Sequence, residues 1–209
     1  MINTSNVGMA TVDAAWPHYS SGLNEELFLY AVVCTPTLRE AGPTILTVEP
    51  GVNSSKVERL RPYTEYTAQV IALVKIYPGG EISFKGSAEA YFKTDEGVPS
   101  KPPGDIKTTT DVGIIRVTWR HVPSDGVNGV LFGYKVFYRL SDDRGDEDNG
   151  AQYSEVTVGP TDLQASIEGL INSETYEIRV AGFTKAGVGV VSEAVYARPG
   201  DSQFRLSLL

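Results

Sequence analysis

The two halves of this sequence repeat one arrangement of tryptophan, leucine and tyrosine residues. In the second half, the alternating segment IIRVTW ends at Trp119, and a leucine stands six residues before Tyr176. In the first half, ATVDAAW ends at Trp16, and a leucine again stands six residues before Tyr66. Because each copy carries its own large aromatic residues for a core, the repeat predicts two small domains of one fold rather than a single large barrel.

Both halves also contain segments in which inward and outward side chains alternate, as they do in a half-buried strand. In FGYKVFYRL the two tyrosines and the valine between them share one face, and FLYAVVC has Tyr, Val and Cys at the matching places. The composition agrees, with 21 Gly, 12 Pro and 11 Tyr but only 2 Met among 209 residues. These features predict an all-β protein with many turns.

The segment TDEGVPSKPPG concentrates proline, glycine and charge between the two apolar-patterned regions. Prolines cannot donate to a strand ladder and favour an extended path, so we place the domain boundary here. The expected organisation is a first domain at residues 1–96, a Pro-rich linker at 97–103, a second domain at 104–200 and a tail at 201–209.

At these residues the chain resembles a tandem pair of fibronectin type III domains. The resemblance rests on the paired tryptophans, the GYKVFYR segment, the Leu-x5-Tyr corners and the AGVGVVSEA run. It implies two immunoglobulin-like β-sandwiches in series. A corner tyrosine can bury its ring while its hydroxyl finds a backbone acceptor. The expected structural core contains Trp16, Tyr66, Trp119, Tyr134 and Tyr176.

Two parts of the chain depart from the family pattern. Only eight residues precede MATVDAAW, so the first domain is expected to lack part or all of its first strand. The tail DSQFRLSLL matches nothing in the family, and with the short start it suggests a piece of a longer chain. The opening residues lack the cationic start and the apolar run of a signal peptide, and no segment reaches the roughly 18 apolar residues of a membrane span.

Charge and chemistry exclude several classes of function. A net charge of −8 argues against a nucleic-acid or anionic-membrane partner, which would require a basic face. His18 and His121 each follow a repeat tryptophan by two residues, which indicates a repeated surface position rather than a converging catalytic or metal site. The lone Cys34 is expected to be an inert core thiol. We therefore predict no enzyme activity, cofactor or metal site.

Two kinds of short motif remain as candidate sites. Asn53 and Asn3 begin N-x-[ST] sequons and are candidate N-glycosylation sites. Arg144, Gly145 and Asp146 form an Arg-Gly-Asp tripeptide, a candidate integrin-binding motif, between the strands expected at YKVFYRLS and AQYSEVTV. Its flanking acidic residues would repel an acidic, metal-bearing partner and lack the spacing of a calcium loop, so they favour a solvated turn.

The sequence thus predicts a non-catalytic protein-interaction and spacer module from the extracellular part of a cell-adhesion molecule or receptor. The parent chain would be membrane-anchored, and its partner would be a cell-surface or matrix protein. Two alternatives stay open: the non-catalytic region of a receptor tyrosine phosphatase, receptor tyrosine kinase or secreted glycan-degrading enzyme, and part of an intracellular cytoskeletal array. The region VGVVSEAV lacks the Trp-Ser-x-Trp-Ser box of cytokine receptors, which disfavours that subclass.

Overall fold

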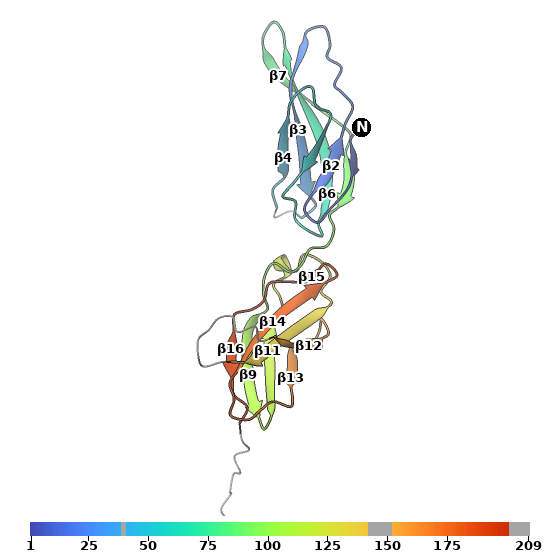
Figure 1. Cartoon of the computed structure of the whole chain (residues 1–209). Helices are drawn as coiled ribbons and strands as arrows, with labels where there is room; N and C mark the ends of the chain where they lie inside the picture. Colours follow the sequence, from blue (N-terminus) through green and yellow to red (C-terminus); the bar gives the residue numbers. More distant parts are fainter. Residues whose placement is uncertain (39–40, 142–151, 201–209) are drawn as a thin grey trace, which may run out of the picture. The chain divides into compact units, whose positions relative to one another are not determined.

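A computed structural model describes residues 1–38, 41–141 and 152–200 of the chain. The chain divides into two compact units, Met1–Glu96 (unit 1) and Gly97–Leu209 (unit 2), and both are built of antiparallel strands (Figure 1). Within the described residues, the helical structure is a single 3-10 turn, Ser124–Gly126. The predicted all-β class is confirmed.

Unit 1 contains two antiparallel sheets. The smaller sheet has the order β1 (Asn3–Ser5), β2 (Val12–Ala15), β5 (Ser54–Val57). The larger sheet has the order β4 (Thr44–Val48), β3 (Glu25–Pro36), β6 (Glu65–Ile76), β7 (Glu81–Gly86), and β8 (Ala90–Lys93) pairs with the start of β6. β1 has only three residues, and the expected loss of part of the first strand stays a prediction.

Unit 2 repeats this topology strand for strand. Its smaller sheet has the order β9 (Gly104–Asp111), β10 (Ile114–Arg120), β13 (Gln164–Ile167). Its larger sheet has the order β12 (Ser154–Val158), β11 (Gly133–Leu140), β14 (Tyr176–Thr184), β15 (Gly187–Val188), and β16 (Val195–Ala197) pairs with the start of β14 (Figure 1). The predicted pair of β-sandwiches is confirmed.

Each unit has its own core, and the repeated aromatic residues lie in it. The Trp16 and Tyr30 rings meet edge to face with centroids 5.5 Å apart, and the Trp119 and Tyr134 rings meet at 5.4 Å with their planes tilted by 56°. All four side chains are buried. Such aromatic pairs add about 0.5–1.5 kcal/mol beyond the area they remove from water, so each sandwich is stabilised independently by the residues that the repeat identified.

The two corner tyrosines make the same hydrogen bond, in a sense opposite to the expected one. The hydroxyl oxygen of Tyr66 accepts from the backbone N–H of Arg61 at 2.8 Å, and that of Tyr176 accepts from Ile171 N–H at 3.0 Å. The backbone group is therefore a donor, and the expectation of a backbone acceptor was wrong. The turn before each strand leaves an N–H without a ladder partner, and a phenol oxygen can accept as well as donate.

The segment expected as a linker, residues 97–103, forms hydrogen bonds within unit 2. Gly97 N–H donates to the carbonyl of Asn128 at 2.8 Å, and the Gly97 carbonyl accepts from the hydroxyl of Thr184 at 2.8 Å. The carbonyl of Pro99 accepts from Val190 N–H at 2.9 Å. These bonds satisfy backbone groups that a free Pro-rich segment would leave to water.

Candidate protein-interaction surfaces

The outward side of the larger sheet in unit 1 carries a continuous set of apolar side chains. Inward residues alternate along β3 and β6, as Tyr30 and Val74 show by their burial, so the residues between them face outward. Register then aligns the outward residues of neighbouring strands. We call this set the apolar face; its members are Leu29, Val33, Ile45, Ile71, Leu73, Ile82 and Phe84.

Cross-strand pairing makes the apolar face continuous across the sheet. Leu73 is the register partner of Leu29 on one side and of Phe84 on the other. Ile45 at the edge strand β4 pairs with Val33 and is 59% exposed, while Phe84 at the opposite edge is 67% exposed. Contiguous exposed apolar residues of this kind mark interaction surfaces more often than they mark ordinary protein surface.

Charged side chains of both signs lie at each end of the apolar face, because Lys93 is the register partner of Glu65 and Glu26 is the register partner of Lys75. Along β6 the outward row begins at the exposed Glu65 and ends at the half-buried Lys75, ten positions later. The ammonium of Lys75 lies 5.3 Å from the Tyr77 ring centroid, and Lys93, the register neighbour of Glu65, places its ammonium 3.6 Å from the Tyr63 ring centroid. The apolar centre therefore has a polar boundary at each end of β6.

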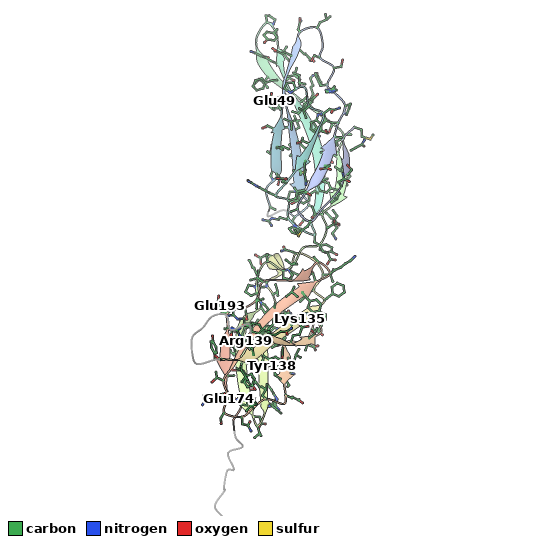
Figure 2. All side chains as sticks on the ribbon, viewed as in Figure 1. Glu49, Lys135, Tyr138, Arg139, Glu174 and Glu193 are labelled. Carbon is green, nitrogen blue, oxygen red and sulfur yellow. The ribbon has the colours of Figure 1, made fainter. Side chains whose placement is uncertain are left out.

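The matching face of unit 2 is covered by a charged and aromatic network. Lys135 and Arg139 lie along β11 (Figure 2), and Arg139 donates to the carboxylate of Glu177 at 2.8 Å. Arg179 donates to the other oxygen of Glu177 at 2.7 Å, and the Tyr153 hydroxyl donates to that oxygen at 2.8 Å. The Arg139 guanidinium also lies 4.6 Å from the Tyr153 ring centroid.

Glu177 is the centre of this network and is only 4% exposed. Burial by itself would raise the pKa of its carboxyl, but hydrogen bonds from Arg179, Tyr153 and Arg139 outweigh burial and hold the pKa at about 2. The same contacts raise the pKa of Arg139 and Arg179. A carboxylate with three donors is already satisfied within the domain, so this face is better suited to internal stability than to an apolar contact.

The predicted glycosylation residues lie on the other side of unit 1. Asn3 is the first residue of β1, and Asn53 directly precedes β5, so both belong to the smaller sheet. Both are exposed, and the Asn53 carbonyl accepts from Trp16 N–H at 2.9 Å. The tripeptide Arg144–Asp146 lies outside the described residues, in the sequence between β11 and β12. Its use by an integrin stays a prediction.

The remaining candidate residues are one buried cysteine and two exposed histidines. Cys34 is fully buried, and burial raises the pKa of its thiol to about 11. His121 is exposed, and its Nδ1 lies 3.0 Å from the hydroxyl of the core residue Tyr134, a contact that sequence reasoning missed. His18 is exposed in unit 1. In the described part of the chain, no group of three or more His, Cys, Asp or Glu side chains is arranged to hold a metal ion.

The sequence analysis also missed a repeated serine that accepts a backbone hydrogen bond in each unit. Ser87 and Ser192 interrupt the last strand of each unit, between β7 and β8 and between β15 and β16. Each hydroxyl accepts from a backbone N–H of the neighbouring strand, that of Val70 at 3.0 Å and that of Val180 at 2.9 Å. The signal was present, because each serine precedes a tyrosine by four residues in both halves.

No helix among the described residues is long and apolar enough to cross a membrane.

Comparison with known proteins gives one family match and several similar chains. A family model described as "Fibronectin type III domain" matches residues 101–198. Cell adhesion molecule Dscam1 of Drosophila melanogaster is 33% identical over 73% of this chain, and Protein sidekick-2 of Gallus gallus is 34% identical over 65%. MAM and fibronectin type III domain-containing protein 1 of Acropora millepora is 29% identical over 88% of this chain and 41% of its own length.

Dscam1 and sidekick-2 are far longer than this chain, which spans 7% of Dscam1 and 6% of sidekick-2. Among solved structures, the FN1–FN3 domains of chicken CNTN1 align over 95% of this chain and 65% of that one, with a TM-score of 0.63 and 19% identity. At that identity the structural match concerns the fold alone.

Proposed function

We propose that this chain, a tandem pair of fibronectin type III domains, is a non-catalytic protein-interaction and spacer module in the extracellular part of a cell-adhesion molecule or receptor. The observation that carries the proposal is the apolar face of unit 1, whose edge residues Ile45 and Phe84 are more than half exposed. Exposed apolar side chains on a rigid sheet offer a partner a contact area that costs little ordering entropy.

The relatives favour the adhesion class over the alternatives. Dscam1 and DSCAM are named as cell adhesion molecules, and they match this chain at 33% and 31% identity. The charge of the chain, −8, is consistent with a protein partner and disfavours nucleic acid or anionic lipid. Partners would dock on exposed sheet faces, while the second sandwich extends the module.

Surface labelling tests the proposed location. An antibody raised against the chain should stain intact cells that express the parent protein, without permeabilisation. Staining that requires permeabilisation would contradict the proposal and favour the cytoskeletal alternative. The parent transcript beyond Leu209 separates the receptor-enzyme alternative, because a catalytic domain after a membrane span would place this pair in a receptor phosphatase or kinase.

We also propose Asn53 as a glycan acceptor, since its side chain is exposed beside a well-formed strand. When the chain is secreted from animal cells, enzymatic deglycosylation should lower its mass. The substitution Asn53→Gln should remove most of that mass difference. Asn3→Gln provides the matched comparison. Deglycosylation without any mass change would show that neither sequon is used.

For the tripeptide Arg144–Asp146, Asp146→Glu is the conservative test. If the motif is used, integrin-dependent cell spreading on the purified chain is abolished by this substitution, while the melting temperature is unchanged. Absence of spreading on the parent chain would end the integrin hypothesis and leave the acidic turn as the remaining interpretation.

A further inference from the structure

We infer that the backbone joint between the two units consists of the φ and ψ angles of a single residue, Glu96. The Pro-rich segment that follows it, residues 97–103, then belongs to unit 2 and does not act as a linker. Because the joint is a property of the chain between the units, it goes beyond the proposed function and holds whichever protein contains the pair. Hydrogen bonds on either side of Glu96 locate it, and each of them lies within one unit.

On the unit 1 side, the backbone is held up to and including the carbonyl of Asp95. The Asp95 N–H donates to the carbonyl of Gly8 at 3.1 Å. The Asp95 carbonyl accepts from the N–H of Tyr63 at 2.9 Å. Because a peptide group is planar, the bond to this carbonyl also fixes the plane of the Asp95–Glu96 peptide on unit 1.

On the unit 2 side, the backbone is held from the N–H of Gly97 onwards. This N–H donates to the carbonyl of Asn128 at 2.8 Å, which fixes the plane of the Glu96–Gly97 peptide on unit 2. The side-chain amide of Asn128 donates to the Val98 carbonyl at 2.9 Å, and the hydroxyl of Thr184 donates to the Gly97 carbonyl at 2.8 Å. Two successive carbonyls are therefore held by two different parts of unit 2.

Close packing holds Pro99 on unit 2 as well. Its carbonyl accepts from the N–H of Val190 at 2.9 Å. A Cβ atom added to the neighbouring Gly189 would stand only 2.5 Å from the Pro99 carbonyl oxygen, a separation that side chains do not tolerate. Pro99 thus lies directly against the backbone of residues 189–190, and the segment cannot pivot separately from unit 2.

Glu96 stands between the two fixed peptide planes. Among the described residues, no hydrogen-bond partner is found for its N–H or its carbonyl, and its carboxylate Oε2 is buried without one. Rotation about the peptide bonds themselves is prevented by resonance, so the φ and ψ angles of Glu96 are the only soft torsions between the two planes.

A joint of this kind changes direction but not length. The Cα atoms of Asp95 and Gly97 are two residue steps apart, at most about 7 Å in an extended chain. A residue other than glycine is restricted largely to the β and right-handed α regions of φ and ψ. The pair therefore samples a limited set of directions at nearly constant spacing, whereas residues 97–103 as a free linker would vary both.

Double electron–electron resonance between one spin label in each unit measures the spread of distances that the joint allows. Thr47→Cys on β4 and Ser166→Cys on β13 place the labels at exposed strand positions of the full chain, and the native Cys34 is buried. In this labelled parent, Glu96→Gly should widen the distance distribution about twofold, because glycine populates positive φ about as readily as negative φ. Glu96→Pro should narrow it, since the proline ring fixes φ.

The matched controls place glycine where the backbone is held on both sides. Asp95→Gly in unit 1 and Val98→Gly in unit 2 each replace an exposed residue and leave the hydrogen bonds of the neighbouring backbone groups in place. Both should keep the parent width. A short run of glycines inserted between Glu96 and Gly97 gives the width of a free linker, and the parent should be narrower than this reference.

Several results would overturn the single-residue joint. These are a Glu96→Gly distribution no wider than the parent, a Val98→Gly distribution as wide as that of Glu96→Gly, and a Glu96→Pro distribution no narrower than the parent. A parent as wide as the glycine insertion would overturn it as well. Unchanged thermal melts confirm that each variant is folded. The surface-labelling result does not depend on these widths, so failure of the joint leaves the proposed function untouched.

Discussion

Unit 1 and unit 2 share one topology but differ on the outward side of the larger sheet. In unit 1 this side is apolar, with Ile45 59% exposed at one edge, whereas in unit 2 it is organised around the buried carboxylate of Glu177. The strands differ as well, since β3 and β6 have 12 residues each, against 8 and 9 in β11 and β14. The inward positions maintain the sandwich, which leaves the outward positions free to diverge in function.

The largest losses of unfolding free energy should come from substitutions in the two cores, where the units are equivalent. Trp16→Ala and Trp119→Ala should each cost about 3–5 kcal/mol of unfolding free energy in their own unit, because each opens a cavity beside a buried tyrosine. Thiol labelling distinguishes the units, since Cys34 is buried in unit 1. Trp16→Ala should accelerate labelling, whereas Trp119→Ala should not. Equal acceleration by both would show that the units unfold together.

The next largest effect should be a loss of stability in acid that affects unit 2 and not unit 1. The pKa of Glu177 is about 2 in the folded chain, below the ordinary 4.5, so its stabilisation of unit 2 is complete above about pH 4.5 and is lost as the pH falls towards 2. The loss is on the order of 3 kcal/mol at most. Urea unfolding followed between pH 6 and pH 2.5 measures it.

Glu177→Gln is the control for the acid effect. It should flatten the pH dependence of unit 2 and cost about 1–3 kcal/mol at neutral pH, because the negative charge and one of the two acceptor oxygens are lost while both guanidinium groups keep access to water. Glu155→Gln removes the carboxylate that pairs with Lys135. Because that carboxylate is more exposed than Glu177, its loss should cost under about 1 kcal/mol. A pH profile that Glu177→Gln leaves unaltered would assign the acid sensitivity to other carboxyl groups.

Small losses of unfolding free energy should also come from removal of the corner hydroxyls. Tyr66→Phe and Tyr176→Phe each delete an acceptor for one backbone N–H, at a cost of about 1 kcal/mol. Because the two bonds have matching geometry, the losses should agree within a few tenths of a kcal/mol. Chemical denaturation of the two variants measures both, and a loss in one unit only would show that the corners are not equivalent.

Part of the candidate surface could have been anticipated from sequence. Alternation along FLYAVVC and YTAQVIAL identifies which residues face inward, and the residues between them are largely apolar in unit 1. What alternation leaves open is which strands are neighbours. The row Leu29–Leu73–Phe84 joins three strands that are distant in sequence, and only their pairing makes three separate side chains one surface.

The network of unit 2 was less accessible to sequence reasoning. Glu177 follows a core tyrosine in YEIRVAGF and occupies an outward position, where a solvated carboxylate is the usual expectation. Its burial depends on Arg139 from β11 and Tyr153 before β12, which cover it from neighbouring strands. The hydrogen bonds of residues 97–103 within unit 2 were also not foreseen, because a Pro- and Gly-rich composition describes the backbone preference of a segment and not its hydrogen-bond partners.

By itself, the sequence determined the all-β class, the two-fold repeat and the core aromatic residues, because alternation and local spacing fix which side chains of a strand share a face. The tertiary structure decided which strands lie side by side, and therefore that one sheet presents an apolar face and its counterpart a satisfied charge network. Neighbouring strands bring together side chains separated by tens of residues, and their combined exposure and charge exist only once those strands are paired.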